Sequence, residues 1–254
     1  MKSMLSTNGL CKYFEGVTAL EGIDLSIESG EIRGIIGPNG SGKTTLINVV
    51  TGLLPATKGE VRFTGENITD VKSHVRTKKG IARTFQIPKL LPEMTCLENV
   101  MLGQHCKFHF DLLGTFLRSP MSRSKQEGLI REKSSELLDF VGLKNSEERM
   151  AGDLSWMEEQ LLQLSRAMAS EPKLLLLDEP TAGMGESESK SVQNVIRKIR
   201  EMGVTLMVVA HDIRLIMEIS DVVTCISFGH KIAEGTPLEV QNHPKVIEVY
   251  LGKE

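Results

Sequence analysis

The fold of this chain is decided by the stretch Gly37-Pro38-Asn39-Gly40-Ser41-Gly42-Lys43-Thr44. It follows the mostly apolar residues 32–36, which predict a strand, and it leads into residues 45–50, which are compatible with a helix. A Gly-x-x-x-x-Gly-Lys-Ser/Thr pattern between a strand and a helix is typical of a phosphate-binding loop. A chance glycine-rich turn is disfavoured because the whole motif and both flanks agree. The sequence therefore predicts a nucleotide site.

The residue types in this loop suit an anion. Without a Cβ, glycine lets backbone N–H groups curl around a phosphate. The helix that begins near Lys43 directs its unpaired N–H groups and the positive end of its dipole toward the same place. In this pattern Lys43 reaches the β- and γ-phosphates, and the hydroxyl of Thr44 ligates Mg²⁺. A nucleoside triphosphate with Mg²⁺ is the predicted ligand.

Composition narrows the class of protein. The chain has 254 residues, of which 40% are hydrophobic and 25% charged, as in soluble globular proteins. Its net charge of −3 argues against nucleic acid as the main partner. The four cysteines lack metal-ligand spacing, which predicts reduced thiols in a cytosolic protein. Neither a signal peptide nor an apolar run of about 20 residues is evident, so any work at a membrane is expected to depend on other subunits.

Hydrophobic periodicity and turn residues divide the chain into an α/β core and a mostly helical insertion. Strands are predicted at residues 5–13, 20–27, 32–36, 59–63, 81–86, 173–177, 205–210, 222–227 and 231–234. Helices are predicted at residues 97–105, 125–141, 154–169, 187–202 and 244–251, with residues 107–124 as a loop or a loose helical excursion. We expect residues 1–88 and 170–254 to form the nucleotide-binding core with its β subdomain, and residues 89–169 to form a helical subdomain.

Two carboxylates follow a predicted buried strand. Residues 174–177 are four leucines, and Asp178 and Glu179 come directly after them. A buried parallel strand is a continuous apolar run, and ligands bind at its carboxyl end. Asp178 is predicted to hold Mg²⁺ through water, and Glu179 to orient and deprotonate the attacking water. An acidic surface loop is the alternative, which the phosphate loop upstream disfavours.

With three further matches, at Gln86, His211 and Phe14, the chain resembles the ATPases of ABC transporters over essentially its whole length. Gln86 matches the glutamine that contacts Mg²⁺ and the attacking water in that family and couples to the permease. His211 matches the histidine that reaches the γ-phosphate, and Phe14 aligns with the aromatic residue that stacks on adenine, with Tyr13 as a substitute. Apart from the resemblance, Phe14 is better interpreted as a core residue and His211 as a solvated residue at a strand end.

The resemblance implies a single ABC ATPase domain, with a RecA-like P-loop NTPase α/β core, an antiparallel β subdomain and an inserted helical subdomain. Two such subunits would close head to tail over two ATPs. Water would then attack the γ-phosphate in line, with Glu179 as base. The implied Mg²⁺ ligands are Thr44, Gln86 and Asp178. The implied ATP contacts are Phe14, Gly37, Pro38, Asn39, Gly40, Ser41, Gly42, Lys43, Thr44, Thr45, Gln86, Asp178 and, toward the nucleotide of the other subunit, Ser155.

Within that family the chain is most similar to the branched-chain amino-acid uptake ATPases. The similar stretches are residues 95–100, 112–114, 182–184 and 242–252. Uptake ATPases for urea and short-chain amides share much of this and are an alternative. The implied partners are a second ATPase subunit, identical or different, a transmembrane permease and, indirectly, an extracytoplasmic solute-binding protein. The permease would dock near Gln86 and the apolar residues among 87–94, with the ATPase peripheral on the cytoplasmic face of the inner membrane.

The signature of the family departs from its usual form. Where the family has Leu-Ser-Gly-Gly-Gln or Leu-Ser-Tyr-Gly-Gln, this chain has Leu-Ser-Trp-Met-Glu at residues 154–158. Ser155 with Glu158 predicts a capping box at a helix start. Met157 replaces a glycine that lets the backbone approach phosphate, and Glu158 adds negative charge there. Gly185 stands at a dimer-contacting Asp or Asn. We hypothesise that this subunit completes a partner's ATP site poorly; alternatively the helix shifts and activity survives.

Two other classes compete with a transport ATPase. Soluble ABC ATPases of DNA repair or translation usually carry two cassettes or a long coiled coil, and this chain has neither. A degenerate subunit that binds ATP as a structural ligand is suggested by Met157 and Gly185. The intact residues Lys43, Asp178, Glu179 and His211 favour hydrolysis.

Overall fold

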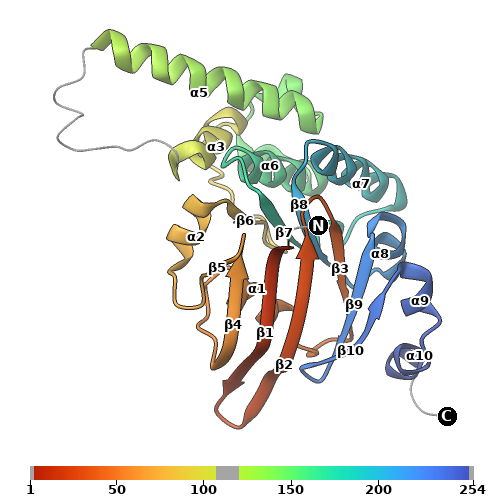
Figure 1. The fold of residues 1–254 in the computed structure, drawn as a ribbon. Helices are drawn as coiled ribbons and strands as arrows, with labels where there is room; N and C mark the ends of the chain where they lie inside the picture. The colour runs from red at the N-terminus through yellow and green to blue at the C-terminus, as the bar shows by residue number, and fades with distance from the viewer. Residues whose placement is uncertain (1–2, 107–119, 252–254) are drawn as a thin grey trace. The chain divides into compact units, whose positions relative to one another are not determined.

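The computed structural model describes residues 3–106 and 120–251 (Figure 1). It consists of two compact units. The first unit comprises Met1–Gln86, Lys173–Gly183 and Ile196–Glu254, and the second comprises Ile87–Pro172 and Met184–Val195. Helix α7 (Glu186–Glu201) contributes residues to both.

A six-stranded sheet forms the centre of the first unit. Its strand order is β10 (His230–Gly235), β9 (Val222–Ser227), β3 (Ile32–Ile36), β8 (Thr205–Val209), β7 (Leu174–Asp178) and β6 (Ile81–Arg83). All neighbouring pairs are parallel except β10 with β9. Every residue of β3, β7 and β8 is buried, as expected of central parallel strands. The carboxyl ends of β3 and β7 therefore carry the predicted phosphate loop and carboxylates to one edge of the sheet.

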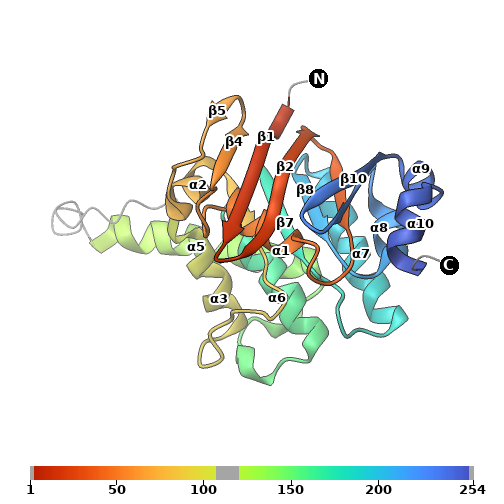
Figure 2. The same ribbon diagram turned by 90° about the horizontal axis from the view of Figure 1, so that it is seen from below.

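A four-stranded antiparallel sheet completes this unit. Its order is β2 (Val17–Glu28), β1 (Ser3–Phe14), β4 (Lys58–Phe63) and β5 (Glu66–Asn67), and Figure 2 shows β4, β1 and β2 side by side. Helix α1 (Lys43–Val50), which follows the phosphate loop, shares a hydrophobic core with both sheets. Leu5 of β1, Leu46 of α1 and Leu176 of β7 all belong to that core and are fully buried. Helix α1 is thus packed against both sheets.

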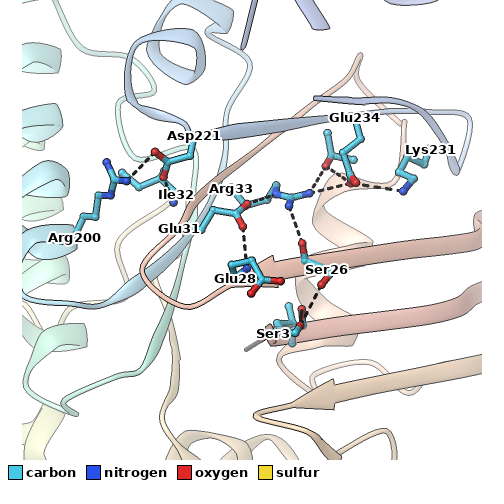
Figure 3. A network of polar contacts seen from close by, with 12 residues as sticks. Ser3, Ser26, Glu28, Glu31, Ile32, Arg33, Arg200, Asp221, Lys231 and Glu234 are labelled. Carbon is cyan, nitrogen blue, oxygen red and sulfur yellow. Dashed lines mark hydrogen bonds and ion pairs between the residues drawn. The ribbon is translucent and has the colours of Figure 1, made fainter. Parts of the chain in front are cut away.

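A buried arginine connects strands of both sheets. Arg33 on β3 donates through Nε to Glu31 Oε1 at 2.6 Å and through Nη2 to the carbonyl oxygen of Ser26 on β2 at 2.7 Å (Figure 3). Its Nη1 donates to Glu234 Oε2 on β10 at 2.9 Å and to Thr224 Oγ1 on β9 at 3.1 Å. The Arg33 side chain is only 4% exposed, so this cation depends on its partners.

Four short elements of the first unit escaped the sequence analysis: β5, α2 (Ser73–Lys79), α8 (Ile213–Ile219) and α9 (Pro237–Gln241). Each is too short for its hydrophobic period to repeat often enough to be recognised. The strand predicted for residues 81–86 was too long, because β6 ends at Arg83. The Thr84 N–H still donates to the carbonyl oxygen of Leu176 at 2.9 Å, and the chain then leaves the sheet.

The second unit is helical. Helices α3 (Cys96–Gly103), α5 (Pro120–Val141) and α6 (Trp156–Met168) pack on one another (Figure 1), and short 3-10 turns lie at Gln104–Cys106, Lys144–Ser146 and Ala151–Asp153. The helix predicted from residue 125 begins at Pro120 instead, since proline is well suited to the first helical turn. The rest of the predicted loop, residues 107–119, lies outside the described residues. No helix within the described ranges is long and apolar enough to span a bilayer.

Candidate active site

The phosphate loop requires glycine at its two ends. Gly37 has a φ of 153°, and a Cβ built on it would clash with the carbonyl oxygen of Ile226 on β9. Gly42, the N-cap of α1, has a φ of 106°, and a Cβ there would clash with the carbonyl oxygen of Ala19 on β2. The Gly229 N–H donates to the carbonyl oxygen of Ser41 at 3.0 Å. The loop is therefore held by the backbone of both sheets, and any side chain at either end would displace it.

Two groups inside the loop suit a phosphate. Lys43 Nζ donates to the carbonyl oxygens of Gly37 and Pro38 at 2.7 and 2.9 Å. Burial lowers the pKa of Lys43, and the charges of Glu179 and Asp178 oppose that shift. Ser41 Oγ is buried and has no hydrogen-bond partner among the described residues. An oxygen of a phosphate in the loop would supply the partner that such a buried donor needs.

Asp178 ends β7 beside a cation that sequence reasoning missed. Its Oδ2 lies 2.9 Å from Nη2 of Arg83, and both side chains are 8% exposed. Burial raises the pKa of Asp178, and the attraction of Arg83 opposes the rise. The one sequence signal for this pair was a charged residue, Arg83, inside the strand predicted at residues 81–86.

Glu179 and His211 are brought together by the neighbouring strands β7 and β8. Glu179 Oε1 lies 2.7 Å from His211 Nε2. Glu179 has a φ of 52°, and its N–H donates to the carbonyl oxygen of Val209 at 2.7 Å. Burial raises the pKa of Glu179, and His211 is the largest influence opposing that rise. A non-glycine residue held at positive φ is typical of functional sites, and here it directs the carboxylate toward the histidine.

The remaining predicted residues of the first unit differ in how exposed they are. Thr44 is exposed at the start of α1, and Gln86 is exposed beyond the end of β6. Phe14 ends β1 with 44% of its surface exposed, and Lys12 Nζ lies 5.0 Å from the centre of its ring. Tyr13 is held by its hydroxyl, which donates to Glu21 Oε1 at 3.1 Å. The core interpretation of Phe14 is therefore wrong, because nearly half of the residue is exposed. Asn39 and Gly40 are exposed and Thr45 is half-buried.

The altered signature lies at the start of α6 in the second unit, where the predicted capping box is confirmed. Glu158 Oε2 accepts from the Ser155 N–H at 2.8 Å, and the Glu158 N–H donates to Ser155 Oγ at 3.4 Å. Arg149 Nη1 donates to Glu158 Oε1 at 2.6 Å. Met157 follows in right-handed helix, without the positive φ that would strain its side chain. The carboxylate of Glu158 is thus bound to the backbone N–H of the helix N-cap, Ser155, and is paired with Arg149. Gly185 stands where the family has a dimer-contacting Asp or Asn. Its N–H donates to Glu188 Oε2 at 3.0 Å.

The pairing of Glu158 makes α6 sensitive to acid. The hydrogen bonds from Arg149 and the Ser155 N–H lower the pKa of Glu158 to about 2. Its contribution to stability is therefore present above the unfolded-state pKa, about 4.3, and is lost as the pH falls through about 2. Glu158→Gln should lower the free energy of unfolding by about 1 kcal/mol at neutral pH, and the loss should vanish in acid. Urea unfolding of both chains across pH measures this.

The neighbouring acid provides the control for that prediction. Glu159→Gln should change the unfolding free energy little, because burial raises the pKa of Glu159 and no cation among the described residues forms an ion pair with it. A cost of Glu158→Gln that stays the same from neutral to acid pH would show that the ion pair is not its source.

Two family models match the chain. A family model described as ABC transporter matches residues 20–182. The chain belongs to the ABC transporter family. A second model, described as branched-chain amino acid ATP-binding cassette transporter, matches residues 230–254 of this ABC ATPase. Membership confirms the resemblance inferred from the sequence motifs.

Relatives align along almost the whole chain. This ABC ATPase is 36% identical to the high-affinity branched-chain amino acid transport ATP-binding protein BraF of Pseudomonas aeruginosa, over 99% of each chain. It is 38% identical to the probable branched-chain amino acid transport ATP-binding protein LivG of Archaeoglobus fulgidus, over 98% of this chain and 95% of that one. It is 34% identical to the high-affinity protein LivG of Escherichia coli, over 98% of each chain.

Solved structures confirm the α/β P-loop NTPase fold. An ATP-binding cassette of an ABC transporter in its ADP conformation is 34% identical, with a TM-score of 0.85 over 100% of each chain. A dimeric cassette in a post-hydrolysis state, bound to ADP and Pi, is 27% identical, with a TM-score of 0.77 over 92% of this chain and 99% of that one. The chain is thus an ABC ATPase, which binds nucleotide and hydrolyses ATP.

Proposed function

We propose that this ABC ATPase powers the uptake of branched-chain or related amino acids through a separate transmembrane permease. The support is the relatives, which are branched-chain amino acid transport ATP-binding proteins, and the second family model at the C-terminal end. In this proposal the chain pairs with a second ATPase subunit, identical or related, at the cytoplasmic face of the membrane. An extracytoplasmic binding protein delivers the solute to the permease. An importer for urea or short-chain amides is the second candidate.

The observation that carries the hydrolytic part of the proposal is the Glu179–His211 contact of 2.7 Å, in the same unit as the phosphate loop. Glu179 takes a proton from water, whose oxygen attacks the γ-phosphorus while the bond to the β-phosphate oxygen breaks. The products are ADP and phosphate. Lys43 and the loop N–H groups hold the β- and γ-phosphates, and His211 holds Glu179 and reaches toward the γ-phosphate.

The residues present fit Mg²⁺ beside these phosphates. Thr44 offers a hydroxyl at the start of α1, Gln86 an amide oxygen after β6, and Asp178 a carboxylate oxygen at the end of β7. Such hard oxygen ligands suit Mg²⁺, which is usually bound by a few protein groups together with substrate phosphates. When bound, the ion neutralises charge on the phosphate oxygens.

Transport can be tested directly by reconstitution. The chain would be produced with a candidate permease and a second ATPase in vesicles, and ATP-dependent uptake of leucine and of urea would be compared. We expect leucine uptake, and recovery of the chain with membranes only when the permease is present. Uptake of urea instead of leucine would favour the second candidate. A chain that hydrolyses ATP but never associates with a permease would favour a soluble ABC ATPase.

Recognition of adenine can be tested at Phe14. Base stacking on an aromatic ring contributes about 1–3 kcal/mol, so Phe14→Ala should raise the dissociation constant for ATP about tenfold. Tyr13→Phe is the matched control and should leave the constant nearly unchanged, since it removes only the hydroxyl bound to Glu21. Calorimetric titration with ATP measures both. Equal affinities of Phe14→Ala and the parent chain would remove Phe14 from the site.

A further inference from the structure

Arg83 contacts three elements of the candidate active site. Its Nη2 donates to Asp178 Oδ2 at 2.9 Å, and its Nη1 donates to Asn48 Oδ1 on α1 at 2.6 Å. The central carbon of its guanidinium group lies 4.5 Å from the centre of the Phe85 ring, and its Nε donates to the carbonyl oxygen of Thr84 at 3.3 Å. A planar fork of donors can hold such separate partners in one geometry, which a lysine cannot do.

Each of these contacts lies next to a proposed magnesium ligand. Asn48 is one helical turn beyond Thr44 on α1, so the two side chains share a face of the helix. Phe85 directly precedes Gln86, and Asp178 is itself the third ligand. The same guanidinium group therefore connects the helix, the strand end and the segment that carry all three oxygen ligands.

The Asp178 contact leaves one carboxylate oxygen for the metal. Arg83 occupies Oδ2 and orients the carboxylate plane, whereas Oδ1 accepts no hydrogen bond from the residues that the structure describes. Asp178 is also fixed through its backbone, because its N–H donates to Thr84 Oγ1 at 3.4 Å. A carboxylate buried to this extent needs a cation to remain charged, and Arg83 is the one within ion-pair distance among the described residues. The pair thus keeps the ligand both charged and oriented.

We propose that Arg83 is a positioning residue for the magnesium site, holding Thr44, Gln86 and Asp178 in the arrangement that a shared Mg²⁺ requires. This inference rests on the proposed function, since it presumes that these three residues hold the ion. Groups that orient metal ligands typically change metal affinity 10–100-fold when they are removed. Loss of Arg83 should therefore weaken the part of nucleotide binding that depends on Mg²⁺ and spare the part made by the phosphate loop.

The experiment measures the affinity for ADP, which binds without turnover, by calorimetric titration in excess Mg²⁺ and in EDTA. The ratio of the two dissociation constants is the gain in affinity due to the metal. We expect Arg83→Met to reduce this gain about tenfold or more, with little change in EDTA. Arg83→Lys keeps a cation near Asp178 but loses the fork, so its gain should fall about threefold or more. If Arg83→Met does not fold, Arg83→Lys decides by itself.

Arg76 provides the matched control. It is 2% exposed and also contacts α1, donating to the carbonyl oxygens of Val49 and Val50 at the end of that helix. Arg76→Met should destabilise the chain to urea as Arg83→Met does, yet keep the full metal gain. An unchanged gain in a folded Arg83→Met or Arg83→Lys chain, or an equal loss in Arg76→Met, would overturn the role of Arg83. A parent chain without any metal gain would overturn the magnesium site itself, and this role with it.

Discussion

The Glu179→Gln chain is expected to hydrolyse ATP at least about 100 times more slowly than the parent chain while it still binds nucleotide. Glutamine keeps the size of the side chain but cannot accept a proton from water. Glu179 is held for this role from two directions, by the 2.7 Å contact with His211 and by its backbone hydrogen bond to Val209. Single-turnover hydrolysis of ATP, beside calorimetric titration of ATP binding, measures the two effects.

Another glutamate of this chain matches Glu179 in backbone conformation. Glu171 has a φ of 49°, against 52° for Glu179, and it is exposed. Glu171→Gln makes the same chemical change in the same left-handed conformation, so it should keep the full hydrolysis rate. Retained hydrolysis in Glu179→Gln would exclude Glu179 as the base, and an equal loss in both variants would point to a structural cause.

The slow Glu179→Gln chain also tests whether the altered signature still closes over a nucleotide. The tryptophan of that signature, Trp156, lies at the start of α6 and is 38% exposed. A change in its fluorescence that coincides with a doubling of molecular mass on adding Mg-ATP, with or without a second ATPase, would support a transport motor. Nucleotide binding without either change would favour the degenerate subunit suggested by Met157 and Gly185.

The parts of the site that the sequence predicted are those governed by local backbone geometry. Gly37 and Gly42 are required where the loop passes close to other backbone, so their spacing alone identified it. Four leucines followed by two acids identified the end of β7, because a buried parallel strand is a continuous apolar run and ligands bind at its carboxyl end. The Arg83–Asp178 pair was missed because its partners are 95 residues apart, and no local pattern specifies which buried cation meets which carboxylate.

In the fold, too, the features set by local sequence were predicted and those set by contacts between distant residues were missed. The buried strands β3, β7 and β8 were predicted because burial on both faces produces a mostly apolar run in the sequence, although β3 also contains Arg33. Helices α2 and α8 have seven residues each, too few for a clear period, and they are stabilised by packing rather than by intrinsic propensity. Contacts between distant strands, such as those of Arg33, were equally invisible in the sequence.

Arg33→Met is expected to lower the free energy of unfolding by about 3–5 kcal/mol, the usual cost of removing one partner from a buried ion pair. The side chains of Arg33 and Glu31 are 4% and 8% exposed, so methionine would leave a buried carboxylate without its cation. It would also remove the hydrogen bonds to Ser26 on β2 and Glu234 on β10 (Figure 3). Urea unfolding followed by circular dichroism measures the loss.

A second substitution separates the charge from the packing. In the double variant Arg33→Met with Glu31→Gln, the buried carboxylate becomes neutral but its oxygen can still accept from the Glu28 N–H, now 2.8 Å away. This variant should recover at least about 1 kcal/mol of the lost stability. Arg62→Met is the exposed counterpart, because Arg62 pairs with Glu60 at the same two-residue spacing but is 48% exposed. It should cost under about 1 kcal/mol. Equal losses at both arginines, or no recovery in the double variant, would show that the buried charge is not what makes Arg33 important.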